Sequence, residues 1–232
     1  HIAFDALCLT EMTNEEKHMK IERLPVGPLQ TNCYILYDEN EKCGIIIDPG
    51  EDADRIVRVV KERGFSVSRI VLTHGHYDHI MALHDVQVAF PDAKLCLCHL
   101  EKDLVNDPYK NLTAYGNKSI KPVQADILLK DGDLIPVGQA NLKVIETPGH
   151  TIGSICLLGE NLLISGDTLF YLGIGRCDLP SGNLASEVDS ILNKLFLLSD
   201  DIMVYPGHGQ ETTIGFEKKN NEVYHYIDRS ER

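Results

Sequence analysis

The chain contains the stretch Thr73-His74-Gly75-His76-Tyr77-Asp78-His79, directly after the apolar run Arg69-Ile70-Val71-Leu72. Without a metal ion, so many converging imidazole and carboxylate groups would leave lone pairs and charges crowded together. In an extended strand, His74 and His76 lie two residues apart and project to the same side. Asp78 and His79 follow where a helix is expected to begin, and they can point to a neighbouring spot from another direction. The spacing H-x-H-x-D-H therefore predicts two adjacent metal ions, one for each pair.

Three further candidate ligands follow short apolar stretches, and each has a glycine beside it. They are His150 in Thr147-Pro148-Gly149-His150-Thr151, Asp167 in Ser165-Gly166-Asp167-Thr168, and His208 in Tyr205-Pro206-Gly207-His208-Gly209. Such positions are typical of the point where a strand ends and a loop opens. Imidazole suits zinc, iron and related ions, and a carboxylate can bridge two of them. The sequence thus offers seven ligands for a pair of ions.

The ordered set H-x-H-x-D-H, then His, Asp and His, resembles the metallo-β-lactamase superfamily. The contexts T-P-G-H-T at 147–151 and G-D-T-L-F at 166–170 narrow the resemblance to the glyoxalase II-like hydrolases, from about Met19 to about Gly215. The resemblance implies an α/β fold, an αββα sandwich in which two sheets pack face to face with helices outside. It also implies a short-form, hydroxyacylglutathione hydrolase-like thioesterase that cleaves S-acylglutathione-type thioesters.

The resemblance also implies which residue holds which metal. It assigns His74, His76 and His150 to the first ion, Asp78, His79 and His208 to the second, and Asp167 to a bridging position. Zinc is the expected metal, with iron or manganese as alternatives, because imidazole and carboxylate ligands accept all three. A bridging water would have a pKa near about 7, so that hydroxide attacks a carbonyl carbon at neutral pH. Asp78 is a candidate to orient this water, and Asp48 is expected to steer a ligand from behind.

Candidate substrate contacts are fewer. The stretch G-I-G-R at 173–176 resembles the family's glycine turn and basic residue near the glutathione glycyl carboxylate, so Arg176 is predicted to pair with a carboxylate. The alternative is a surface ion pair with Asp178. The polar segment 106–118 is too long for an ordinary connector. It is either a solvated loop or a flap that contacts substrate through Tyr109 and Tyr115.

The resemblance leaves the acceptor thiol open. Glyoxalase II proper holds glutathione partly with a basic C-terminal helical domain, whereas residues 214–232 leave room for one helix. The family's tyrosine shortly after the last histidine is also absent, since Gly209-Gln210-Glu211 stands there. We therefore expect weak binding of glutathione thioesters before reaction.

Other functions are open at this point. A persulfide dioxygenase is an oxidoreductase with one iron, and it shares the fold and a stretch like Gly175-Arg176-Cys177-Asp178. A quorum-signal lactonase would be another hydrolase, acting on an ester ring. From a different class, the chain could be a binding module with a vestigial site, but a complete ligand set disfavours this reading.

Composition limits the partners. The chain has 232 residues, 43% of them hydrophobic, which fits one domain at 19–232. The formal charge of 22 − 35 = −13 argues against nucleic-acid binding. No apolar stretch is long enough for a membrane span and no signal peptide is visible, so the expected partner is a small thioester or ester. The oligomeric state is left open.

The cysteines indicate the cellular compartment, and the first residues indicate where the domain begins. Seven cysteines without a C-x-x-C pair indicate small buried residues in a reducing cytoplasm, with Cys96 and Cys98 on one strand face. His18-Met19 resembles a vector junction, so residues 1–18 are expected to be vector-derived or an upstream extension.

Hydrophobic periodicity predicts alternating strands and helices. Strands are expected at 34–37, 44–47 and 94–98, and helices at 54–63, 80–89, from Leu100 and at 186–198. Gly64 is the expected end of the first helix, and Ser186 is the expected N-cap of the last. Residues 188, 191, 192, 195 and 196 form one apolar stripe on that helix, which predicts a core-facing surface.

Overall fold

The computed structural model describes residues 19–116 and 118–227, so the expectation for residues 1–18 lies outside the described residues. Two six-stranded sheets form its centre. The first has the order β1 (Met19–Val26), β2 (Thr31–Asp38), β3 (Cys43–Ile47), β4 (Ser66–Leu72), β5 (Lys94–Cys98) and β6 (Ile127–Leu129). The second has the order β14 (Thr212–Thr213), β13 (Met203–Pro206), β10 (Leu162–Gly166), β9 (Ile155–Leu158), β8 (Ala140–Glu146) and β7 (Leu134–Val137). A small hairpin joins β11 (Leu169–Phe170) to β12 (Gly173–Ile174).

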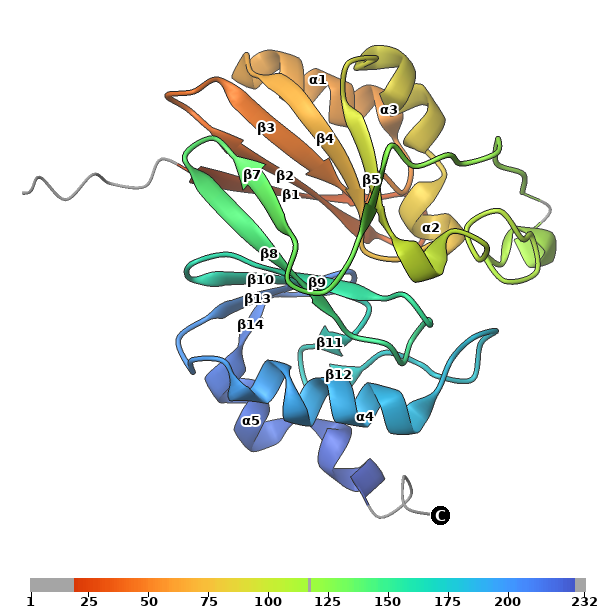
Figure 1. The fold of residues 1–232 in the computed structure, drawn as a ribbon, viewed down its shortest axis with the longest axis vertical. Coiled ribbons are helices and arrows are strands. Elements are labelled where there is room, and N and C mark those ends of the chain that lie inside the picture. Colours follow the sequence, from red (N-terminus) through yellow and green to blue (C-terminus); the bar gives the residue numbers. More distant parts are fainter. Residues whose placement is uncertain (1–18, 117, 228–232) are drawn as a thin grey trace, which may run out of the picture.

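Helices cover the outer face of each sheet (Figure 1). The first sheet carries α1 (Ala53–Arg63) and α3 (Leu83–Ala89), and the second carries α4 (Leu184–Asn193) and α5 (Ile214–Asn220). Neighbouring residues of a strand face opposite sides, so Ile45 and Ile47 pack between the sheets while Ile46 packs against the outer helices. Apolar residues therefore fill three layers of core, and the predicted αββα sandwich is confirmed.

Strand direction gathers loops at one edge of each sheet. In the first sheet β3, β4 and β5 run parallel, and in the second β10 runs parallel to β13. Parallel strands place their carboxyl ends at the same edge, where the loops after them meet. Asp48 follows β3 and the H-x-H-x-D-H stretch follows β4, while Asp167 and His208 follow β10 and β13.

The predicted elements agree with the first half of the structure except at one helix. The strand predictions fall within β2, β3 and β5, and α1 ends at Gly64, whose φ of 69° is the left-handed conformation of a glycine cap. The helix predicted at 80–89 is wrong as a continuous element, because it divides into α2 (Tyr77–Ile80) and α3. At the break, the Ala82 N–H donates to Pro49 O at 3.0 Å. A contact with a distant segment therefore interrupts the helix.

The helix predicted at 186–198 is also shorter than expected. It begins after Asn183, whose side chain accepts from the Ser186 N–H at 2.9 Å, so Ser186 is not the N-cap. After Asn193 the chain continues as the 3-10 helix η3 (Leu195–Leu197). Four of the five stripe residues are buried against the second sheet, which confirms the core-facing side: Val188, Ile191, Leu195 and Phe196.

The remaining short elements are 3-10 helices. These are η1 (His99–Glu101), where a short helix was expected, η2 (Thr113–Gly116) and η4 (Glu222–Tyr226). Cys96 and Cys98 are free thiols buried between the sheets, as predicted. Within residues 19–116 and 118–227, no helix is both long and apolar enough to cross a membrane.

Candidate metal centre

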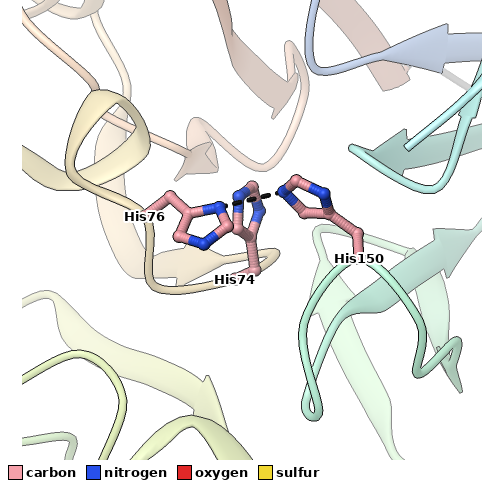
Figure 2. A group of neighbouring side chains, drawn as sticks. All are labelled: His74, His76 and His150. Carbon is pink, nitrogen blue, oxygen red and sulfur yellow. Dashed lines mark hydrogen bonds between the residues drawn. The ribbon is translucent and has the colours of Figure 1, made fainter. Parts of the chain in front are cut away.

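All seven predicted ligands come together at the edge where these loops meet. His74, His76 and His150 form one group and Asp78, His79 and His208 another, and within each group the ligand atoms lie within 4.8 Å of one another. A third group shares members with both, because His74, His79 and Asp167 satisfy the same limit. Figure 2 shows the first group, in which the loop after β4 presents His74 and His76 opposite His150 from the second sheet.

Asp167 lies between the two groups. Its Oδ2 is 3.6 Å from His150 Nε2 and 3.5 Å from His208 Nε2, while its Oδ1 is 3.4 Å from His79 Nε2. Within the first group, His76 Nδ1 and His150 Nε2 are 2.9 Å apart. One carboxylate is therefore within reach of ions held by either group.

Several of these buried atoms lack a hydrogen-bond partner. Among the described residues, the Nε2 atoms of His74, His76 and His79 and the Oδ1 atom of Asp167 have none. Leaving a buried polar group unsatisfied costs about 1–3 kcal/mol, so four such atoms at one place need an explanation. Imidazole nitrogen and carboxylate oxygen are ligands for zinc and iron, and the set fits divalent metal ions.

The protonation states of His74, His76 and Asp167 also suit metal binding. Burial holds the pKa of His74 well below its usual range and lowers the pKa of His76 to about 3, so both imidazoles keep a free lone pair. Burial alone would also lower the pKa of His79, but the charges of Asp167, Asp78 and Asp48 outweigh it and raise that pKa. Burial would raise the pKa of Asp167, yet the charge of His79 outweighs it and leaves this carboxyl at about 2. Its oxygens are therefore ionised at neutral pH.

Asp48 stands behind the cluster. Its Oδ2 contacts His79 Nδ1 at 2.9 Å, which leaves Nε2 of the same ring directed at Asp78 and Asp167. The main-chain nitrogen and hydroxyl of Thr73 donate to the two Asp48 oxygens at 2.7 and 2.6 Å. Asp48 thus fixes the orientation of His79 and the start of the H-x-H-x-D-H stretch together.

Two buried glutamates, not anticipated from the sequence, hold the ligand loops. Glu101 accepts from the main-chain nitrogens of Gly75 and Gly153, each at 2.8 Å, and Glu187 Oε2 accepts from that of His150 at 2.8 Å. Both side chains belong to fully buried residues. The burial of Glu187 could have been predicted from the sequence, because it lies on the apolar side of its helix at the spacing that Leu184, Val188 and Ile191 share. The sequence carries no such signal for Glu101.

His208 approaches the cluster because its loop is fitted tightly around Asp167. A Cβ added at Gly207 would lie 2.0 Å from Asp167 Oδ1, so only glycine fits beside that carboxylate. The Asn32 N–H donates to Gly207 O at 2.7 Å, and His208 Nδ1 contacts Leu29 O at 3.2 Å. The start of β2 therefore holds the last ligand loop in place.

Arg176 is attached to the cluster through its main chain. His150 Nδ1 contacts Arg176 O at 2.8 Å, while the Arg176 side chain is 62% exposed. Its guanidinium forms two hydrogen bonds with Asp178, at 2.7 and 2.8 Å. The structure thus contains the surface ion pair named as an alternative, and it also places Arg176 beside the first histidine group.

The two tyrosines of segment 106–118 lie at the surface. Tyr109 and Tyr115 are 66% and 72% exposed, and their rings meet edge-on with centroids 6.4 Å apart. Tyr109 lines a pocket of about 670 Å³ with residues such as Lys102 and Leu128, and none of the seven candidate ligands lines it. Their contact with substrate stays a prediction.

Comparisons with known proteins agree with the cluster. A family model described as "Metallo-beta-lactamase superfamily" matches residues 26–208. The hydroxyacylglutathione hydrolase GloC of Haemophilus influenzae is 34% identical over 206 residues, which are 88% of this chain and 97% of that protein. The crystal structure of the BLEG-1 B3 metallo-beta-lactamase has a TM-score of 0.82 at 35% identity, covering 88% of this chain and 98% of that one. TTHA1623 in a di-iron-bound form has a TM-score of 0.76 at 29% identity, covering 87% and 98%.

Proposed function

Because the chain belongs to the metallo-beta-lactamase superfamily, we propose that it is a two-metal thioesterase acting on S-acylglutathione-type thioesters. The family and its named hydrolases support metal-dependent hydrolysis. The thioester substrate and the pair of ions are what we propose in addition. One observation carries it: three buried histidine nitrogens and one oxygen of Asp167 have no hydrogen-bond partner, and the Asp167 carboxylate reaches both histidine groups. The relative named hydroxyacylglutathione hydrolase supports the choice of substrate.

The proposed ligand sets follow the two groups. His74, His76 and His150 would hold the first ion, Asp78, His79 and His208 the second, and Asp167 would bridge them. Zinc is the expected ion for hydrolysis, and iron or manganese would fit the same ligands. The di-iron form of TTHA1623 supports a two-ion site in a related chain and leaves the choice of metal open.

The chemistry divides between the ions and the chain. Two divalent ions would supply a water of lowered pKa and a positive charge for the oxygen of the attacked carbonyl. Asp78 is ionised, since the charge of His79 outweighs the effect of burial and holds the pKa of its carboxyl below the usual range. Its Oδ2 accepts from the Thr31 hydroxyl at 3.0 Å, so the carboxylate is fixed in position to orient that water. Attack at the carbonyl carbon breaks the C–S bond, and the thiolate that leaves takes a proton from solvent.

Arg176 is proposed to receive the thiol half of the substrate. Its main-chain carbonyl contacts His150, and its exposed guanidinium already holds one carboxylate, that of Asp178, through two hydrogen bonds. A glutathione glycyl carboxylate offers the same pair of acceptors. Substrate binding therefore requires an exchange of one carboxylate for another.

The test is hydrolysis by protein of defined metal content. Metal-free protein should not cleave S-lactoylglutathione, and protein reloaded with zinc should release free thiol. Asp167→Asn, prepared in the same way, should release little. If no metal form cleaves a thioester while a homoserine lactone is opened, the protein is a lactonase and the proposed substrate is wrong.

A further inference from the structure

A small pocket opens beside Asp78, on the side of the second ligand group. It has a volume of about 160 Å³, and Val26, Pro28, Leu29 and Tyr77 contribute to its lining. Asp78 itself lines the pocket, so a group bound there would lie next to a proposed metal ligand. The lining is mostly carbon, which suits an apolar occupant.

The turn that forms one wall is bound to the cluster. The Leu29 carbonyl contacts His208 Nδ1 at 3.2 Å, and the Thr31 hydroxyl donates to Asp78 at 3.0 Å. The Gly27 N–H donates to Asp52 at 3.0 Å, which holds the other end of the turn. The wall is therefore preformed, with the second ligand group as its neighbour.

Lys118 and Glu51 also line the pocket. Lys118 forms an ion pair with Glu51 and places its Nζ 5.0 Å from the centroid of the Tyr77 ring. The Lys118 and Glu51 side chains are 29% and 28% exposed, so the pair is partly shielded from water. Lys118 therefore lines the same pocket as the candidate ligand Asp78.

Arg176 lies on the side of the first ligand group, away from this pocket. Its carbonyl contacts His150 in the first ligand group, whereas the pocket is lined by Asp78 of the second group and by Leu29, whose carbonyl contacts His208. Asp167 lies between the two groups. A thioester whose carbonyl lies at the centre of the cluster therefore has one recognition site on each side.

We propose that the pocket beside Asp78 binds the acyl chain of the thioester, while the thiol half extends toward Arg176. This inference rests on the proposed function and adds a substrate class to it: short apolar acyl groups. The pocket is small, and the ion pair of Lys118 with Glu51 is part of its lining, so we expect a long chain to displace that pair. Acyl length is therefore the property by which the enzyme selects.

The test uses two matched series of glutathione derivatives, each with alkyl groups of increasing length. S-acylglutathiones report kcat/KM, and S-alkylglutathiones, which are thioethers and are not hydrolysed, report affinity by calorimetry on the metal-loaded protein. Each methylene that enters the pocket should raise both quantities about fourfold. The increase should stop, or reverse, once the pocket is filled.

Variants locate the effect. Lys118→Met removes the ion pair and should move the optimum to longer chains. Leu29→Phe places a larger side chain in the lining and should narrow the pocket, while it keeps the main-chain carbonyl that contacts His208. It should move the optimum to shorter chains. Lys121→Met is the matched control, because Lys121 contacts His84 and does not line the pocket beside Asp78, and its profile should equal the wild type.

The outcomes separate this inference from the proposed function. If thioesters are hydrolysed with a flat length profile that neither Lys118→Met nor Leu29→Phe changes, the pocket is not the acyl site and the thioesterase proposal stands. If no thioester is hydrolysed but thioether affinity still rises with length and shifts in both variants, the pocket stands and the proposed reaction is wrong. A shift in Lys121→Met equal to that in Lys118→Met would also overturn the assignment.

Discussion

The main-chain N–H of His150 donates a 2.8 Å hydrogen bond to Oε2 of Glu187. Glu187 is fully buried on α4, the helix outside the second sheet, so its carboxyl group links this helix to the loop of a candidate ligand. Burial raises the pKa of Glu187 well above its usual value, and its second oxygen has no hydrogen-bond partner among the described residues. A buried carboxyl in this position is costly, which suggests that positioning His150 is its role.

Glu187→Ala should therefore weaken metal binding as well as the fold. It leaves the His150 N–H without an acceptor, which should lower the free energy of unfolding of metal-free protein by about 1–3 kcal/mol. Loss of such an outer hydrogen bond should weaken metal affinity about 10–100-fold. Urea unfolding and a competition titration with a metal chelator measure the two effects.

Two variants give this prediction its controls. Glu187→Gln keeps an acceptor oxygen and should retain most of the metal affinity. Asp189→Ala removes an exposed carboxylate from the same helix and should change neither quantity appreciably. Equal losses in Glu187→Ala and Asp189→Ala would mean that the contact with His150 does not position it.

Asp167 should affect both ions at once. Wild-type protein is expected to bind two metal ions per chain, and Asp167→Ala should lose metal binding and turnover together, because this carboxylate reaches both groups. The loss of turnover should exceed the about 10–100-fold typical of removing an outer hydrogen-bond partner. Metal analysis by mass spectrometry and a thioester assay on the same samples check it.

A second cluster supplies the control for the metal count. Cys98, His99 and Glu146 also bring ligand atoms within 4.8 Å of one another, apart from the seven residues above. Cys98→Ser should leave two ions per chain. One tightly bound ion in fully loaded wild-type protein, with Asp78 and His208 uncoordinated, would contradict the two-metal site.

The cluster of candidate ligands could be predicted from the sequence because each residue is marked locally. A polar residue beside glycine at the end of an apolar run is visible within a few positions, as at His150 and His208. The break between α2 and α3 was not visible, since it depends on Pro49, far from Ala82 along the chain. Glu101 was missed for the same reason, because its partners lie 26 and 52 residues away. Local patterns therefore predicted the candidate ligands, and contacts across the fold determine how these side chains are held.

Arg176 and Asp178 give a pair of opposite predictions. Arg176→Ala should raise KM for S-lactoylglutathione by about fivefold with little change in kcat, because the contact is remote from the reacting carbonyl. Asp178→Asn should lower KM, since it removes the carboxylate that competes for the guanidinium. Arg58→Ala, at an exposed site on α1, is the control. Unchanged KM in both Arg176→Ala and Asp178→Asn would mean that this arginine does not bind substrate.

The choice between hydrolase and persulfide dioxygenase depends on oxygen and on the metal. The stretch Gly175-Arg176-Cys177-Asp178 fits both enzymes and does not separate them. Hydrolysis needs neither O₂ nor a redox change, whereas a dioxygenase needs an iron with open positions, and zinc has no redox chemistry. Zinc-loaded protein should therefore cleave S-lactoylglutathione under nitrogen, and iron-loaded protein should consume no O₂ with glutathione persulfide. An oxygen electrode and a thiol-release assay, run on both metal forms, measure this directly. Oxygen uptake by the iron form, with no thioester cleavage by either form, would establish the dioxygenase instead.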